Sequence, residues 1–281
     1  MVFVPKSRPS SGPGPNAAAW ERKSGLMGRF AMIALCASLL GAATADAEEA
    51  AGEVEARAAL ADSAWAFVYW RSAAGRAADD FGVEAPALDA GYAYGGEDGA
   101  LNLVATATAD EVRLRLEGSG WRDRTDDAER ILTRNAAHEV AHVFQYAVGP
   151  ALEPQWLHEG FADALAHEAM TARGEARGWG GGLRCAEVLN AEPIQAAQAA
   201  GDARALYDCS SIAIRAVAAA RGEDVRNFYV AFAAEGGTDA AFLRLAGDGG
   251  RAADVTAFLT RDWRHADPAW VIRQLRAGRL G

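Results

Sequence analysis

Residues 126–172 read DDAERILTRNAAHEVAHVFQYAVGPALEPQWLHEGFADALAHEAMTA. Apolar side chains recur every three or four positions on both sides of a break at residues 149–150, which predicts two helices joined by a short loop. The first helix is expected to begin near Asp126, because Glu129 follows three residues later in the manner of a capping box. The second is expected near 155–172.

The first of these helices carries His138, Glu139 and His142 in the order HExxH. Side chains four residues apart lie on one face of a helix, so both imidazoles can point at one metal ion. Glu139 is turned by about 100° from His138, which places it beside the ion, where it can serve as a general base. The flanking residues are apolar, as expected of a buried active-site helix. The alternative is two core histidines beside a solvated glutamate.

A catalytic zinc site normally has three protein ligands and one open position. The metzincin pattern HExxHxxGxxH does not supply the third ligand, because Gln145 and Val148 occupy its glycine and last histidine positions. Glu159, seventeen residues after His142 on the next predicted helix, is the strongest candidate. The side chains that could act in this way are His158, Glu159, Asp163, His167 and Glu168.

A second motif, Trp156-Leu157-His158-Glu159-Gly160-Phe161-Ala162, resembles the WLxEGxA signature of gluzincin metallopeptidases. That clan includes thermolysin and the zinc aminopeptidases, and the chain most resembles the compact bacterial families grouped as peptidase MA-like. The resemblance covers roughly residues 125–170. It implies a pair of zincin active-site helices, a Zn²⁺ cofactor, and Glu159 as the third metal ligand beside His138 and His142.

The same resemblance implies two further roles. Asp163, one turn after Glu159, matches a thermolysin-type arrangement in which a carboxylate accepts the second N–H of a zinc-bound histidine. An ordinary helix carboxylate is the alternative. Tyr207, at the start of an apolar helix, corresponds to the gluzincin tyrosine that stabilises the oxyanion. A buried structural tyrosine is the alternative there, with Tyr146 as the second candidate for the role.

Three other side chains near the second motif are expected to have no catalytic part. His158 precedes the proposed ligand and is expected to be structural or to line the pocket. His167 and Glu168 are expected to lie on a solvated helix face.

The substrate implied by the resemblance is an extended peptide that pairs with an edge strand, here expected at residues 101–105. The GxMEN segment by which zinc aminopeptidases hold a free N-terminus is absent, which favours an endopeptidase.

The remaining chain predicts an α+β fold. Residues 48–75 have helical periodicity and end in a glycine, and residues 88–117 alternate as strands and turns. Only helical patterns follow from residue 185 onward. We therefore expect a small antiparallel sheet, the two zincin helices and a helical C-terminal part. The N-terminal helix and sheet part would cover 48–124, and the helical zinc-site part 125–281, within a single catalytic domain.

Residues 1–47 are typical of a signal peptide with an extended n-region. Basic residues precede an uncharged run at 30–45, which is followed by acidic residues, and cleavage fits after Ala45 or Ala47. The run is shorter than the roughly 20 residues of a membrane span. We expect export to the periplasm or the medium without stable membrane insertion. An uncleaved N-terminal anchor is the alternative.

The charge of the chain limits its partners. The formal net charge is −10, and loss of residues 1–45 removes five basic residues and one acidic residue, which brings it to −14. Such an acidic protein is a poor partner for nucleic acid or anionic lipid.

Two cysteines, Cys185 and Cys209, remain after Cys36 is lost with the signal peptide. In an exported protein such a pair is expected to form a disulfide. This bond would hold the segment that carries Tyr207. Reduced, buried cysteines are the alternative.

These features predict an exported zinc-dependent metallopeptidase acting on peptide or protein substrates. A catalytically silent zinc-binding scaffold or interaction protein of the cell envelope is the first alternative. A helical protein that binds no metal and contains the motif by chance is the second. The sequence does not predict the oligomeric state.

Overall fold

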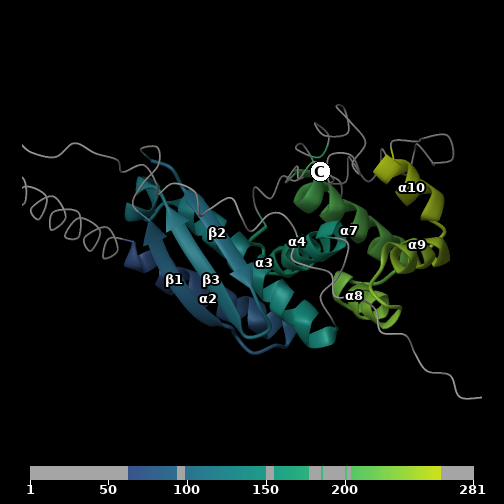
Figure 1. Ribbon diagram of the computed structural model, residues 1–281, viewed down its shortest axis with the longest axis horizontal. Helices are drawn as coiled ribbons and strands as arrows, with labels where there is room; N and C mark the ends of the chain where they lie inside the picture. The colour runs from purple at the N-terminus through teal and green to yellow at the C-terminus, as the bar shows by residue number, and fades with distance from the viewer. Residues whose placement is uncertain are drawn as a thin grey trace, which may run out of the picture. The chain divides into compact units, whose positions relative to one another are not determined.

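The computed structural model is α+β, as predicted, with a three-stranded sheet and seven α-helices among the residues that it describes (Figure 1). The predicted signal peptide, residues 1–47, and the start of the first predicted helix lie outside those residues. Within them, no helix combines the length and apolar character needed to cross a membrane. The described residues are 63–93, 99–149, 155–176, 185, 200 and 204–260.

Helix α2 (Ala64–Phe81) extends past the glycine that was expected to end it. Gly75 lies inside the helix, so this prediction is wrong. The helix ends at Gly82, whose φ of 65° gives the left-handed conformation of a helix C-cap. Buried alanines on both sides of Gly75 face α3, and this packing continues the helix beyond the glycine.

The sheet has the order β1 (Ala87–Ala93), β3 (Glu111–Glu117), β2 (Asn102–Ala107). The neighbours β2 and β3 are antiparallel, as expected, but β1 and β3 are parallel. The prediction of a wholly antiparallel sheet is therefore wrong, because β3 inserts between two strands that run in opposite directions. Alternate residues of β3 are fully buried, so one face of the sheet joins the core and β2 forms an edge.

Helices α3 (Asp126–Val148) and α4 (Gln155–Ala172) have the predicted boundaries. The N-cap is Thr125, one residue before the expected cap, and its side chain accepts a hydrogen bond from the backbone N–H of Ala128. The break at Gly149 follows the last turn of α3. The two helices pack against each other, and α3 also packs against α2 and β2.

The C-terminal part is helical throughout its described residues, as predicted. Gly160 of α4 sets its approach to α7, since a Cβ atom there would lie 2.5 Å from the Cβ of Ser210 and 2.9 Å from Cδ1 of Ile214. A glycine thus allows two buried helices to meet at short range. The elements are the short π-helix η2 (Arg204–Cys209), α7 (Ser210–Arg221), α8 (Val225–Ala234), α9 (Asp239–Asp248) and α10 (Ala252–Thr260).

Candidate metal centre

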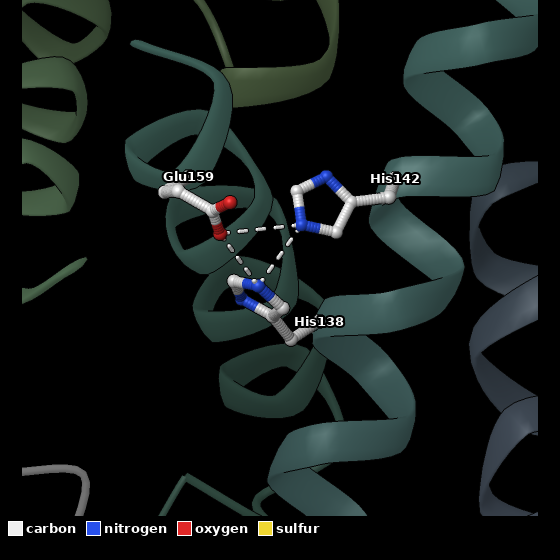
Figure 2. Close-up of side chains that lie close together, drawn as sticks. All are labelled: His138, His142 and Glu159. Carbon is white, nitrogen blue, oxygen red and sulfur yellow. Dashed lines mark hydrogen bonds and ion pairs between the residues drawn. The ribbon is translucent and has the colours of Figure 1, made fainter. Parts of the chain in front are cut away.

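The three side chains predicted as metal ligands meet between α3 and α4 (Figure 2). The Nε2 atoms of His138 and His142 lie 3.1 Å apart. Oε2 of Glu159 lies 3.2 Å from the first and 3.4 Å from the second. All three potential ligand atoms lie within 4.8 Å of one another, and the group is largely buried. It could therefore hold a metal ion.

His138 is supported by a carboxylate from the neighbouring helix. Its Nδ1 lies 2.9 Å from Oδ1 of Asp163, whose other oxygen accepts a hydrogen bond from Arg134 at 3.0 Å. Burial raises the pKa of Asp163, but the Arg134 charge and the His138 contact outweigh it and lower the pKa to about 2. The aspartate is thus an acceptor, and Nδ1 of His138 carries the proton. Arg134 also pairs with Asp208 at 3.5 Å.

His142 is supported by an amide on its own helix. Gln145 donates through Nε2 to the backbone carbonyl of His158 at 2.9 Å. A carbonyl only accepts, so Oε1 must face the other partner, Nδ1 of His142, at 2.7 Å. This contact requires a proton on Nδ1 and leaves Nε2 of His142 as an electron-pair donor.

The hydrogen bonds on both Nδ1 atoms determine what can lie at the centre of the group. Two unprotonated Nε2 atoms and a carboxylate oxygen repel one another unless a positive charge, a proton or a metal ion, lies among them. Burial raises the pKa of Glu159, but the two imidazoles outweigh it and hold the pKa below its usual range. Burial lowers the pKa of His138, whereas Asp163 and Glu159 raise it, to about 10. The surroundings therefore favour a cation.

Glu139, the expected general base, is buried but does not belong to the three-residue group. Its Oε1 accepts a hydrogen bond from Asn135 at 3.1 Å. Both residues line a cleft of about 1040 Å³ together with His138 and Asp163. The carboxylate thus lies beside the possible metal position and faces a space large enough for a substrate.

Edge strand β2 and Tyr207 also line this cleft. Residues 101–105, the expected docking strand, all contribute to its wall. The ring of Tyr207 lies 5.6 Å from that of His138, centroid to centroid. Burial and the charges of Glu159 and Glu139 raise the pKa of Tyr207 to about 12, so its hydroxyl keeps its proton and can donate. Tyr146, the second candidate, is not among the lining residues and contacts the ring of His158.

The structure joins Cys185 and Cys209 in the expected disulfide, with both residues buried and their Cα atoms 5.0 Å apart. Cys209 is the last residue of η2, the short π-helix that also contains Tyr207 and Asp208. The covalent bond therefore holds the segment that brings these two side chains to the site.

Three neighbouring side chains have structural contacts. His158 stacks on His142 with ring centroids 4.3 Å apart, so it packs against the site. A structural role was one of the two roles expected for it. His167 and Glu168 were expected on a solvated face, and that prediction is wrong. Both are half-buried, because α7 and α8 cover this side of α4. His167 contacts Arg215, and Glu168 accepts from the backbone N–H of Val225 at 2.8 Å.

Arg134, Asn135 and Gln145 were missed from the sequence although all three contact the site. Asn135 and Gln145 lie three or four residues from the side chains that they support, so helical spacing carried a usable signal for these two. Asn135 is one turn before Glu139, and Gln145 is three residues after His142. Arg134 supports Asp163, which is 29 residues away in the chain, so its contact had no such signal. The contact between Asn135 and Trp70 of α2 could not be predicted from helical spacing, because the two residues lie 65 positions apart in the chain.

Comparisons with known proteins give no relative from which a role could be transferred. No protein family, curated protein or solved structure matches the chain. The geometry of this site and the two motifs are therefore the features that indicate a function.

Proposed function

We propose that the protein is an exported zinc-dependent peptidase of the gluzincin type. The observation that carries the proposal is the convergence of His138, His142 and Glu159 beside a separate carboxylate, Glu139, on the wall of a cleft. A metal-binding group alone suits many proteins. A metal-binding group with an adjacent base and an adjoining edge strand suits hydrolysis of an extended chain.

Zinc fits the donor set best. Two imidazole nitrogens and one carboxylate oxygen are the protein ligands of thermolysin-type catalytic zinc sites, which keep a further position for water or substrate. Asp163 and Gln145 accept from the Nδ1 atoms and so present both Nε2 atoms to the ion, which is the usual support of zinc-bound histidines. When bound, zinc supplies Lewis acidity, which polarises a carbonyl group and makes water more acidic.

The side chains around this position divide the remaining work. Glu139 takes a proton from the attacking water and returns it to the leaving amine. Tyr207, whose hydroxyl is protonated at neutral pH and whose pKa is raised further, to about 12, donates to the oxygen on which negative charge develops. Arg134 keeps Asp163 ionised and thereby keeps His138 in one orientation.

An extended peptide is the substrate class that the cleft favours. Strand β2 lies at the edge of the sheet and forms part of the cleft wall, so its outer backbone groups can pair with a substrate strand. Because the aminopeptidase segment GxMEN is absent, we assign endopeptidase activity. The signal-peptide pattern and the disulfide both suit a protein that functions outside the cytoplasm.

The test combines metal analysis with a Glu139→Gln variant. We expect one zinc ion per chain by mass spectrometry after purification without chelators, and cleavage of a fluorogenic peptide library that a chelator abolishes. Glu139→Gln should keep zinc and lose activity by a factor on the order of 10²–10⁴. Glu168→Gln is the matched control, since its half-buried carboxylate lies outside the site, and it should remain active.

Each failure has a separate meaning. Absence of zinc overturns the metal site itself. Zinc without cleavage identifies a silent scaffold, and full activity in Glu139→Gln overturns the assigned base.

A further inference from the structure

Asn135 connects the expected base to the hydrophobic core. It lies on α3 one turn before Glu139 and donates through Nδ2 to Oε1 of that carboxylate at 3.1 Å. Its Oδ1 accepts from Nε1 of Trp70 on α2 at 2.8 Å. Trp70 is fully buried among core side chains, so its indole has a fixed position. A line of two hydrogen bonds therefore runs from the core to the cleft wall.

The direction of this line follows from the chemistry of its members. An indole N–H can only donate, so it must face the oxygen of the Asn135 amide. The amide nitrogen then has to face Glu139, which accepts with its carboxylate. Trp70 thus settles the orientation of an amide that could otherwise rotate. No other hydrogen bond to the Glu139 carboxylate occurs among the residues that the structure describes.

A carboxylate that acts as a general base needs one oxygen fixed by a hydrogen bond and the other oxygen available to accept a proton. The bond from Asn135 restricts the Glu139 carboxylate to one orientation, and it leaves Oε2 for the proton of the attacking water. An amide N–H cannot take up that proton, so the support does not compete with the transfer. Small errors in the placement of such a group have large effects on rate.

We infer that Asn135, locked by Trp70, is a positioning residue for the base Glu139, and that the pair sets the turnover rate of the enzyme. This inference rests on the proposed peptidase function. It adds a residue pair that neither the HExxH motif nor the second motif contains. The metal ligands are not involved, so metal binding and turnover should separate in the test.

Asn135→Asp removes the donor while it keeps an oxygen for Trp70. The new carboxylate oxygen faces Oε1 of Glu139 and repels it. We expect kcat on the best-cleaved library peptide to fall by roughly tenfold or more, with KM and zinc content unchanged. Trp70→Phe frees the amide to rotate and should lower kcat to a smaller extent. This second variant keeps the test usable if Asn135→Asp does not fold.

The double variant distinguishes positioning from general damage. If Trp70 acts through Asn135, adding Trp70→Phe to Asn135→Asp should cause no further loss of kcat, whereas independent structural effects would multiply. Tyr69→Phe is the matched control. Tyr69 bonds to Thr133 at 3.2 Å, so the variant loses one hydrogen bond between α2 and α3 that does not reach Glu139. It should keep the original kcat.

Two results would overturn the inference, and they are distinguishable from failure of the function. An active parent protein with unchanged kcat in Asn135→Asp, or multiplied losses in the double variant, removes the positioning role alone. A zinc-loaded parent protein that cleaves no peptide removes the proposed function, and the positioning role with it.

Discussion

The two histidines of the candidate metal centre are supported in different ways. Nδ1 of His138 faces Asp163, a charged group on another helix that is itself paired with Arg134. Nδ1 of His142 faces Gln145, a neutral amide on the same helix. The first support depends on the packing of α3, α4 and η2, since Asp208 of η2 also pairs with Arg134. The second is placed by one turn of α3, and only the orientation of its amide depends on α4, through the carbonyl of His158.

This difference predicts unequal contributions to metal binding. A hydrogen bond to a charged acceptor is roughly twice as strong as one between neutral groups. The charged support also raises the electron density on the imidazole more than an amide does. The Asp163 side should therefore contribute more to zinc affinity, and it should be more sensitive to changes in helix packing.

Asp163→Asn gives the largest expected effect, because it makes the support of His138 resemble that of His142. The amide oxygen can still accept from Nδ1, but the charge is lost and Arg134 loses its ion pair with residue 163 while it keeps the one with Asp208. Zinc affinity should fall on the order of 10–100-fold, as measured by competition with a fluorescent chelator. Asp208→Asn is the control, because it pairs with Arg134 without touching His138. Equal losses in both variants would contradict a direct role for the Asp163 contact.

Gly160→Ala tests the dependence on packing. The added methyl group would lie 2.5 Å from the Cβ of Ser210, so α4 has to move away from α7. The free energy of unfolding should fall by about 1–3 kcal/mol in urea titrations. Gly75→Ala is the matched helical control, since nothing lies within 4 Å of its Cβ position. It should stabilise the protein by about 0.5–1 kcal/mol. If the Gly160→Ala variant were as stable as the parent protein, α4 would have more room beside α7 than the structure indicates.

Gln145→Met should have a smaller effect than Asp163→Asn on zinc binding. The thioether fills a similar volume but provides only a weak acceptor for His142 and no donor for the carbonyl of His158. We expect a loss of about tenfold in zinc affinity, at the low end of the usual range for such supports. The same chelator competition measures it. A greater loss than in Asp163→Asn would reverse the proposed order of the two supports.

Local patterns predicted the elements of this fold better than their arrangement. The boundaries of α3 and α4 followed from periodicity and from the break at Gly149. The end of α2 did not, because packing on α3 carries the helix past Gly75 to a left-handed glycine. The parallel pairing of β1 with β3 depends on which strands become neighbours, and alternation within a strand does not contain that information.

The site shows the same division. Helical spacing placed His138 and His142 on one face, and the second motif indicated Glu159, so the three-residue group was predictable. Asn135 and Gln145 could have been predicted from the same helical spacing. Arg134 could not, because its partner Asp163 lies 29 residues away in the chain. Trp70 could not either, because its contact with Asn135 joins residues 65 positions apart in the chain. The covering of His167 by α7 likewise depends on tertiary packing.

His167 lies one turn beyond Asp163 on α4, and it tests how far the charged surroundings of His138 extend. The expected effect is the smallest of the set. One guanidinium nitrogen of Arg215 lies 3.0 Å from Nδ1 and 3.2 Å from Nε2 of the ring, and a guanidinium only donates, so at least one ring nitrogen must be unprotonated. Burial, followed by the charge of Arg215, lowers the pKa of His167 to about 4 from 6.5. The unfolded chain therefore takes up a proton before the folded one does. The resulting stability is fully present above pH 6.5 and is lost as the pH falls towards 4.

A His167→Gln variant lacks this titration and should lose less stability over the same interval. Because the side chain is partly exposed, we expect the difference to be on the order of 1 kcal/mol. Urea unfolding of both proteins above pH 6.5 and near pH 4, with chelator present so that metal release does not contribute, measures it. Equal losses would mean that His167 is protonated in the folded protein. Arg215 would then have to point away from the ring, and the charged surroundings of His138 would end at Asp163.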